Sequence, residues 1–253
     1  MIERVPELGS TNAELLGRLV GNVAPVEGDW LMADRQSGGR GRLGREWLSP
    51  PGNLYASTVV TLAPGDPPAP TLAFVAGLAV HDSLGRAGSQ VRLKWPNDLM
   101  VGAAKLAGIL CERSGEAVVV GIGVNVATAP AVTGRESVAL AAIDDHAPDA
   151  AGLLATLARR FAHRLARWRT EPLRETFAEW KMRAHPRGTK LSVTVDGAMI
   201  EGAFDGLEAD GALRLRLASG DWRAIHAGEV GLVPDAAGAK SDTKADTKAD
   251  KDS

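Results

Sequence analysis

The sequence predicts an α+β protein with a mixed-sheet domain, a small β-barrel and a disordered tail. Over the first 185 residues, strand-like segments are joined by helices in some places and by hairpin turns in others, which favours a mixed sheet over a doubly wound one. Residues 190–233 contain only short alternating segments separated by tight turns. From Asp235 the chain repeats Thr-Lys-Ala-Asp and has nothing to bury. We therefore expect domains at residues 1–185 and 186–234, with residues 235–253 disordered.

The first predicted helix begins at residues 10–12, where Thr11 and Glu14 have the spacing of a capping box. A largely buried helix is expected over PTLAFVAGLAVHDSLGRAG, which is apolar around most of its circumference. Residues 149–169 carry apolar side chains at helical spacing, and a shorter helix is expected over residues 172–180. The expected strands are WLMA, NLYASTVVTL, VRLKW, KLAGILCE and AVVVGIGVNV, the last two joined by a Ser114-Gly115 turn.

Turn residues divide the predicted barrel into four or five strands. Asp196-Gly197 is a type I′ hairpin signal, and Asp210-Gly211 and Ser219-Gly220 mark two later turns. A linker is expected at His185-Pro186-Arg187-Gly188, because proline and glycine both interrupt regular structure.

The composition is that of an ordinary globular protein, with 45% hydrophobic and 24% charged residues. The net charge of −2 provides no global basic field for DNA or an anionic membrane. The one cysteine, Cys111, excludes an internal disulfide and suits a reducing compartment. No signal peptide is evident, and no apolar run approaches the roughly 18 residues of a membrane-spanning helix. We therefore expect a cytoplasmic protein with no DNA or membrane partner.

The segment GGRGRLGREW is rich in glycine and arginine and fits the dinucleotide pattern GxGxxG at Gly39, Gly41 and Gly44. That site needs a helix directly after the glycines, whereas Pro50 and Pro51 follow here and prevent one. The segment also lacks the Gly-Lys-Ser/Thr ending of a P-loop. Both of these nucleotide motifs are therefore excluded.

Two other interpretations of this loop remain: a surface loop with solvated arginines, or a loop that binds an anion. Closely spaced glycines let the backbone approach a ligand and turn its N–H groups inward. Arg40, Arg42 and Arg45 add forked donors suited to carboxylate or phosphate. Three arginines in one loop of an acidic chain do not make a nucleic-acid surface. The combination favours a loop that folds over a small anionic ligand.

Two lysine-bearing segments add candidate site residues. KWPNDLM places Lys94, Asn97 and Asp98 just past a strand, with Pro96 fixing the turn. Lys105 begins a strand that is otherwise apolar. Its ammonium group either reaches solvent at an edge or is held as a charge for a ligand.

A glycine-bearing strand, GIGVNV, places Gly121 and Gly123 inside a predicted strand. Glycine weakens a strand interior and usually marks the close approach of another group. Each of these features also has a structural explanation, but their combination favours a binding site.

The motifs STN, DRQSGGRGRLGREW, KWPNDL, KLAGIL and GIGVNV, in this order and spacing, resemble those of the biotin–protein ligases. The resemblance covers Ser10 to about Val126 by motif and extends to Val233 by architecture. It implies a mixed-sheet catalytic domain like those of class II aminoacyl-tRNA synthetases and biotin/lipoate ligases, followed by an SH3-like barrel. It also implies an ATP-dependent enzyme. Such an enzyme activates biotin as biotinyl-5′-AMP and transfers it to one lysine of a carboxylase's biotin carboxyl carrier domain.

The resemblance assigns roles to individual residues at the matching positions. The implied biotin-binding residues are Ser10, Thr11, Asn12, Gln36, Gly39, Arg40, Gly41, Arg42, Lys105, Gly121 and Gly123. The implied nucleotide-binding residues are Arg40, Arg45, Trp47, Asn97, Asp98, Lys105 and Asn125. The implied catalytic residues are Lys105, Arg42 and Asp98.

Within this scheme Lys105 neutralises the charge that builds up when the biotin carboxylate meets the α-phosphate. Trp47 forms a wall against adenine, and Asp98 orients the incoming lysine amine. Gly121 and Gly123 leave room for the biotin chain beside their strand. Mg²⁺ is expected to arrive with ATP, because ATP chemistry needs a divalent cation. No protein-only metal site is expected.

Some family members carry an N-terminal DNA-binding domain, and the position of Ser10 predicts a form without one. A monomer and a homodimer are both compatible with the sequence. The alternative functions are a lipoate or octanoate ligase of the same fold, and a non-catalytic biotin-binding module. Lys105 and Arg42 argue against the module, because a protein that only binds biotin gains nothing from a cation at a reacting phosphate.

Overall fold

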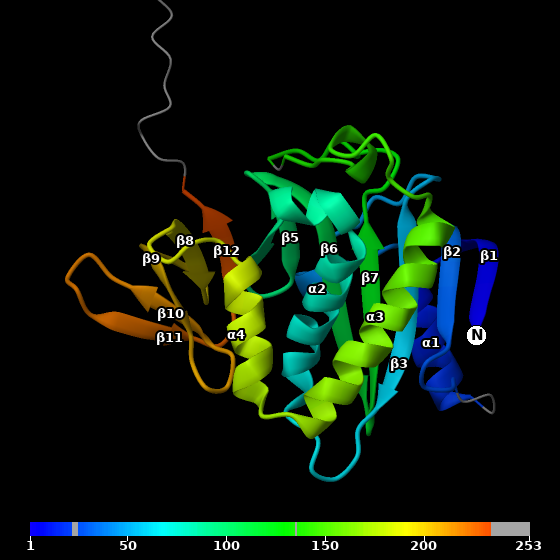
Figure 1. The fold of residues 1–253 in the computed structure, drawn as a ribbon, viewed down its shortest axis with the longest axis horizontal. Coiled ribbons are helices and arrows are strands. Elements are labelled where there is room, and N and C mark those ends of the chain that lie inside the picture. The colour runs from blue at the N-terminus through cyan, green and yellow to red at the C-terminus, as the bar shows by residue number, and fades with distance from the viewer. Residues whose placement is uncertain (22–24, 135, 234–253) are drawn as a thin grey trace, which may run out of the picture.

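The computed structural model describes residues 1–21, 25–134 and 136–233. The predicted disordered tail, residues 235–253, lies outside the described residues. The described chain forms two sheets, one within residues 2–124 and one within residues 190–232 (Figure 1).

The first sheet has seven strands in the order β1-β2-β3-β7-β6-β5-β4. Its strands are β1 (Ile2–Leu8), β2 (Trp30–Gln36), β3 (Leu54–Thr61), β4 (Arg92–Lys94), β5 (Asp98–Val101), β6 (Ala104–Ser114) and β7 (Ala117–Val124). Strand β1 runs parallel to β2, and every other neighbouring pair is antiparallel. The predicted mixed sheet is therefore confirmed.

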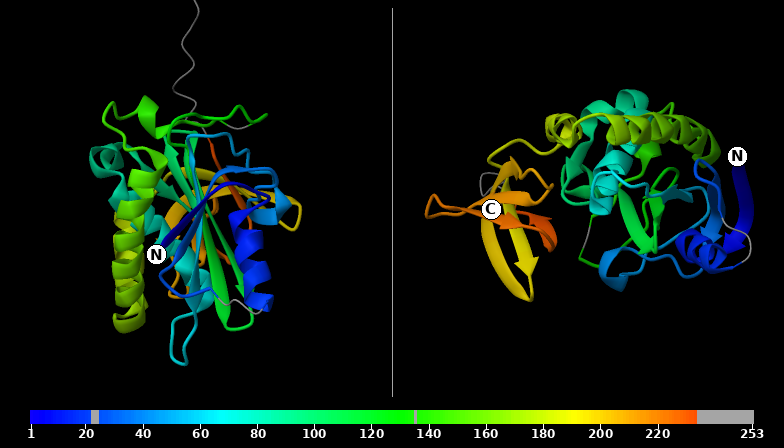
Figure 2. Two further views of the ribbon diagram at one scale, coloured as in Figure 1. Left: turned by 90° about the vertical axis from the view of Figure 1, so that its right-hand side faces the viewer. Right: turned by 90° about the horizontal axis from the view of Figure 1, so that it is seen from below.

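Helices cover both faces of this sheet (Figure 2). They are α1 (Thr11–Val20), α2 (Leu72–Ser83), α3 (Ala150–Thr170) and α4 (Leu173–Arg183). Along β2, Trp30 and Met32 join the large core beneath α2 and α3, while Leu31 packs with Leu15 of α1 on the opposite face. This alternation follows from the two-residue period of a strand. The face of the sheet that carries α1 is only partly covered by helix, and the candidate site lies on this face.

The four predicted helices are present, and α1 begins within the predicted residues 10–12, although α2 ends at Ser83, before the end of the predicted segment. The N-cap of α1 is Ser10, whose Oγ accepts a hydrogen bond from the Ala13 N–H at 3.4 Å. The capping box predicted for Thr11 and Glu14 is wrong. Glu14 instead accepts a hydrogen bond from Arg18 one turn later, at 2.9 Å. Thr11 is the first helical residue and bonds outside the helix, as described below.

The second sheet has five antiparallel strands in the order β11-β10-β9-β8-β12. Its strands are β8 (Lys190–Val195), β9 (Ala198–Leu207), β10 (Leu213–Arg216), β11 (Trp222–Ile225) and β12 (Glu229–Leu232). Asp196 and Gly197 have φ angles of 49° and 81°, as the predicted type I′ turn requires. Trp180 of α4 packs between Phe74 of α2 and Phe204 of β9, so α4 joins the two sheets.

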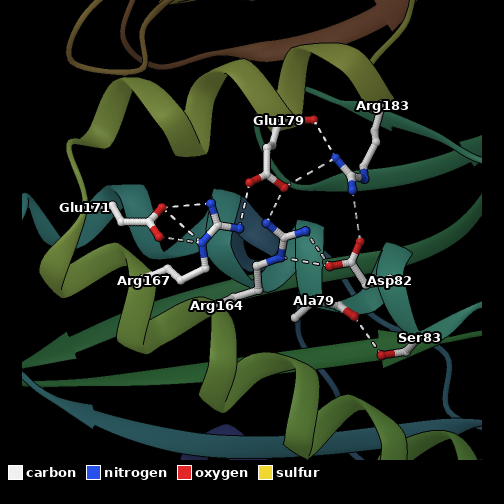
Figure 3. Close-up of polar contacts among 8 residues, drawn as sticks. All are labelled: Ala79, Asp82, Ser83, Arg164, Arg167, Glu171, Glu179 and Arg183. Carbon is white, nitrogen blue, oxygen red and sulfur yellow. Dashed lines mark hydrogen bonds and ion pairs between the residues drawn. The ribbon is translucent and has the colours of Figure 1, made fainter.

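A network of ion pairs connects helices α2, α3 and α4 to one another (Figure 3). Arg164 of α3 contacts Asp82 of α2 at 2.6 Å and Glu179 of α4 at 2.5 Å. Glu179 also accepts from Arg167 at 2.7 Å, and Arg183 reaches Asp82 at 3.3 Å. Because Asp82 pairs with two arginines and Glu179 with three, α2, α3 and α4 are tied together by charge as well as by their apolar core.

Two strands were not predicted from the sequence. β1 is an edge strand in which most residues are exposed, so it has no apolar alternation that would reveal it. β5 begins at Asp98, within a segment that we expected to lie past a strand. β4 and β5 instead form a hairpin around the cis Trp95-Pro96 bond. The KWPND motif is therefore the end of one strand, a turn and the start of the next.

Candidate functional site

A pocket of about 500 Å³ opens on the α1 side of the seven-stranded sheet. It lies between the first turn of α1, the Gly39–Arg45 loop, strands β4 to β7 and strand β12 of the second sheet. The predicted site residues that line it are Ser10, Thr11, Asn12, Gln36, Arg40, Gly41, Arg42, Arg45, Trp47, Asn97, Asp98, Lys105, Gly121 and Gly123. Segments spread over more than 110 residues of sequence therefore meet at one place.

Two predicted residues, Gly39 and Asn125, are not among the pocket's lining. Asn125 is buried, and its Nδ2 donates to the carbonyl of Lys105 at 3.2 Å, so it supports the backbone that carries this lysine. A Cβ atom on Gly39 would lie 2.6 Å from the carbonyl oxygen of Trp47. Glycine there lets the two ends of the arginine-bearing loop pair closely, with the Trp47 N–H donating to the Gly39 carbonyl at 3.0 Å.

One end of the pocket is uncharged and polar. The side-chain oxygen of Gln36 accepts from the Thr11 N–H at 2.8 Å, and its Nε2 donates to Ser49 at 3.2 Å. These partners fix which end of the Gln36 amide is the oxygen. Each amide nitrogen carries two hydrogens, so the Nε2 of Gln36 keeps a second donor in addition to the one bound to Ser49.

Asn12 is fixed in the same way by residues that the sequence analysis missed. Its Nδ2 donates to the carboxylate of Glu112 at 2.7 Å and to the carbonyl of Leu110 at 3.3 Å. Its Oδ1 accepts from the hydroxyl of Ser57 at 2.6 Å. Ser57 is fully buried in β3, and this polar residue at a buried strand position was an available signal. Glu112 lies near the end of a predicted strand, and no sequence pattern marked it as a site residue.

The glycines of β6 and β7 allow side chains to lie directly on the sheet. Gly108 and Gly123 are cross-strand partners, and a Cβ atom on Gly123 would lie 2.7 Å from the indole ring of Trp47. A Cβ atom on Gly121 would lie 2.1 Å from Oδ1 of Asn12. The space that we expected to be left for a substrate chain beside these two glycines is therefore taken by Trp47 and Asn12. Both glycines still line the pocket.

The Trp47 ring has two further features relevant to ligand binding. Lys105 Nζ lies 5.2 Å from the ring centroid, in a cation–π arrangement. The indole Nε1 is buried and has no hydrogen-bond partner among the described residues. A buried donor without a partner is uncommon.

Lysine and aspartate side chains form a charged cluster at the centre of the pocket. Lys105 Nζ lies 2.5 Å from Asp98 Oδ1, and Lys94 Nζ lies 3.0 Å from Asp98 Oδ2. Burial alone would raise the pKa of Asp98. The charges and hydrogen bonds of Lys105 and Lys94 outweigh burial and hold the pKa of this carboxyl below its ordinary value of 3.8. Asp98 is therefore ionised at neutral pH, and the two lysines exceed it by one positive charge.

The second sheet supplies the remaining wall, which the sequence analysis did not predict. Lys94 Nζ donates to the carbonyl of Val230 at 2.9 Å, and Arg42 donates to the carbonyl of Gly228 at 3.5 Å. Arg45 forms an ion pair with Glu229. Burial lowers the pKa of the Arg42 guanidinium, which donates a hydrogen bond to a carbonyl rather than to a carboxylate. Arg42 thus brings a partly buried positive charge to the pocket.

Other types of site are not supported by the described residues. Burial raises the pKa of Cys111 to about 12, so its thiol stays protonated and is a poor nucleophile. Within residues 1–21, 25–134 and 136–233, no group of three or more His, Cys, Asp or Glu side chains could hold a metal ion. In the same part of the chain, none of the helices combines the length and apolar character needed to cross a membrane.

Comparison with known proteins agrees with this geometry. Residues 20–127 match the model of the biotin/lipoate A/B protein ligase family. The chain is 38% identical to the biotin–[acetyl-CoA-carboxylase] ligase of Paracoccus denitrificans, over 87% of this chain and 96% of that protein. The chain belongs to the biotin protein ligase family. A second ligase of the same name, from Mycobacterium tuberculosis, is 32% identical over 90% of this chain and 88% of its own length.

The fold is also that of the biotin protein ligases. The structure is similar to the biotin protein ligase of Aquifex aeolicus in complex with biotin and ATP, with a TM-score of 0.80 and 27% identity. That match covers 92% of this chain and 99% of the other. The predicted mixed-sheet architecture, followed by a small C-terminal β-structure, is confirmed by this likeness.

Proposed function

We propose that this biotin protein ligase activates biotin as biotinyl-5′-AMP and then transfers the biotinyl group to a lysine of a carboxylase's biotin carboxyl carrier domain. The observation that carries the proposal is the composition of the pocket. An uncharged end with fixed donors and acceptors is continuous with an end where Lys105, Lys94 and Arg42 surround one aspartate. A neutral polar head and an anionic tail are the two ends of biotin.

The polar end matches the hydrogen-bonding groups of the ureido ring. That ring offers one carbonyl acceptor and two N–H donors. Gln36 retains a second amide hydrogen after bonding to Ser49, and Asn12 Oδ1 retains a second lone pair after bonding to Ser57. Because Asn12 is buried and Gln36 is half-buried, a substrate that left these groups unpaired would be bound much more weakly.

The charged end supports the first reaction. A biotin carboxylate oxygen attacks the α-phosphorus of ATP, the bond between the α-phosphorus and the bridging oxygen breaks, and pyrophosphate leaves with the electron pair. Two anions must approach for this to happen. Lys105 and Arg42, held by Asp98 and by the Gly228 carbonyl, stabilise the charge that accumulates on the phosphoryl oxygens. The free N–H of Trp47 is a further donor for the nucleotide.

In the second reaction the neutral amine of the carrier lysine attacks the acyl carbon, the acyl–oxygen bond breaks and AMP leaves. The amine releases one proton to solvent as the amide forms. We propose that Asp98 holds the ammonium groups of Lys105 and Lys94 beside the phosphate in both steps. Orientation of the incoming amine is a second role that we propose for this carboxylate, since it is ionised and lines the pocket.

A magnesium ion would enter with ATP. Such ions are usually held by substrate phosphates plus one or two carboxylates. Four carboxylates line the pocket, of which Asp98 and Glu229 already pair with cations, while Glu46 and Glu136 are exposed. This donor set fits an ion carried mainly by the nucleotide, whose charge would neutralise the phosphates.

Incorporation of radiolabelled biotin tests the proposal. The purified chain is incubated with ATP, Mg²⁺, labelled biotin and a carrier domain, and lipoic and octanoic acids are offered in parallel. We expect label on the carrier only when biotin and ATP are both present. Transfer of lipoate or octanoate in preference to biotin would assign the chain to the other branch of the fold. Biotin binding without transfer would leave only a binding module.

A further inference from the structure

The carboxylate of Glu112 lies behind the polar end of the pocket. Its Oε2 accepts a hydrogen bond from Asn12 Nδ2 at 2.7 Å. Glu112 extends from β6 and is half-buried, and it is not among the residues that line the pocket. Its hydrogen bond to Asn12 connects Glu112 to the pocket, because Asn12 lines the pocket and is 5% exposed.

The partners of Asn12 determine which way its amide faces. An ionised carboxylate and a backbone carbonyl can only accept hydrogen bonds, so Glu112 and Leu110 require the NH₂ group on their side. The oxygen is then directed to Ser57 and lies over Gly121, where a Cβ atom would be 2.1 Å from it. Reversing the amide would place an oxygen 2.7 Å from a carboxylate, which is strongly unfavourable.

We propose that Glu112 is a positioning residue that sets substrate specificity by holding the Asn12 oxygen toward the pocket. In that orientation the pocket offers a hydrogen-bond acceptor, and it selects acids that carry an N–H group at their head. A cyclic urea satisfies this requirement, whereas a dithiolane ring or an alkyl chain has no hydrogen to donate. This inference rests on the proposed biotin ligase function and adds the residue that orients the acceptor.

A purely structural role for Glu112 predicts a different pattern of effects. Loss of a structural contact would lower stability and disturb all substrates together. A positioning role affects the head group alone, because Lys94, Asp98 and Arg42 belong to β4, β5 and the arginine-bearing loop, and Lys105 lies at the opposite end of β6 from Glu112. The two roles are therefore separated by comparing biotin with ATP, and ureido acids with acids that lack N–H groups.

The first experiment measures binding and steady-state kinetics of the full chain with Glu112→Ala. We expect the Kd and KM for biotin and for desthiobiotin, which keeps the ureido ring, to rise about 10-fold, the effect of one charge-assisted hydrogen bond. The KM for ATP, the kcat at saturating biotin and the weak Kd for octanoic acid stay within about twofold. Glu116→Ala, at an exposed glutamate in the β6–β7 turn, is the matched control and leaves all values unchanged.

A second test exchanges the hydrogen-bonding roles of residues 12 and 112, so that residue 112 donates and residue 12 accepts. It can still be used if Glu112→Ala does not fold. Asn12→Asp alone puts two carboxylates together and weakens biotin binding. Asn12→Asp combined with Glu112→Gln restores a donor facing an acceptor, with an oxygen still bonded to Ser57. We expect the double variant to recover part of the biotin affinity that Asn12→Asp loses, because the Leu110 carbonyl still faces an oxygen of residue 12.

Three results would overturn the inference. They are a biotin Kd within twofold of the original in Glu112→Ala, equal losses for biotin and octanoic acid, and no recovery in the double variant. Failure of the unaltered chain to bind biotin would instead remove the proposed function itself. The two failures are therefore distinguishable in one set of titrations.

Discussion

The ammonium nitrogen of Lys105 lies 2.5 Å from Oδ1 of Asp98, while Lys94 occupies the other carboxylate oxygen at 3.0 Å. One carboxylate therefore fixes two cations on the wall of the pocket. Lys94 also bonds to the Val230 carbonyl of β12, which connects this cluster to the second sheet. In the reaction that we propose, the cluster holds positive charge in place before a phosphate arrives, so little reorganisation is needed.

The first prediction concerns the pH dependence of this cluster. Because the folded pKa of Asp98 lies below its ordinary value of 3.8, the cluster's contribution to stability is fully present above that value and is lost as pH falls through the lowered pKa. We expect the chain to have a higher Tm than Asp98→Asn by a constant amount at pH 5 to 8. The difference should shrink steadily below about pH 4. Thermal unfolding of both proteins across this range checks it, and a Tm difference that does not change with pH would contradict it.

The second prediction concerns Arg42 and retention of the intermediate. Arg42→Gly removes the loop's contact with Gly228 and a positive charge from the pocket. Loss of a hydrogen bond to a charged group weakens binding about 10- to 100-fold. We expect activated biotin to escape and label bystander proteins, detected by streptavidin blotting of added albumin. Arg86→Gly, at an exposed arginine distant from the loop, serves as the control. Unchanged labelling of albumin would mean that the loop does not retain the intermediate.

The third prediction concerns the ion pair between Arg45 and Glu229, which joins the arginine-bearing loop to β12. The Arg45 and Glu229 side chains are 35% and 46% exposed, so the pair contributes only about 0.2–1 kcal/mol and is screened by salt. We expect Glu229→Gln to speed tryptic cleavage within the loop by up to about fivefold at low salt. At ~1 M salt the two proteins should be cleaved alike. Glu201→Gln, on the exposed side of β9, should behave like the unaltered chain. Equal cleavage rates at low salt would show that the pair does not hold the loop.

The fourth prediction concerns the helix network of Figure 3. The side chain of Arg164 is 10% exposed and pairs with both Asp82 and Glu179. Arg164→Ala removes the cation that these two acids share, and because they keep Arg183 and Arg167 as partners we expect a loss of about 1–3 kcal/mol. Urea denaturation should show this loss in the free energy of unfolding. Arg174→Ala removes an arginine that is 78% exposed and should change stability by less than about 0.5 kcal/mol. Similar values for the two variants would contradict a role for the network in holding the helices.

Much of the fold could be read from the sequence because periodic apolar patterns report burial directly. The stripe on α3 from Leu153 to Trp168 is buried as predicted, and the Asp196-Gly197 turn has the predicted backbone angles. β1 could not be found in this way. Its side chains are mostly exposed, and it is held by backbone pairing with β2, which leaves no sequence pattern.

The site was predictable where a motif concentrates unusual residues, as in the arginine-bearing loop and KWPND. Contacts made through tertiary structure were not. Glu229 and Val230 lie more than 100 residues after Lys105, and nothing local marks them as pocket residues. Glycine in β7 was correctly taken as a sign of close approach. Only the structure identifies the approaching groups as Asn12 and Trp47.

The most direct test of the account is biotin-dependent exchange of labelled pyrophosphate into ATP. It is measured for the unaltered chain, for Lys105→Ala and for the control variant Lys181→Ala, which replaces an exposed lysine of α4. Exchange reports adenylate formation without any carrier protein. If Lys105 stabilises the charge where carboxylate meets phosphate, the unaltered chain and Lys181→Ala exchange only when biotin is present. Lys105→Ala should then lose on the order of 10²–10³-fold in rate while keeping its circular dichroism spectrum. Biotin-dependent exchange that is undiminished in Lys105→Ala, or exchange that is absent from the unaltered chain, would contradict the account.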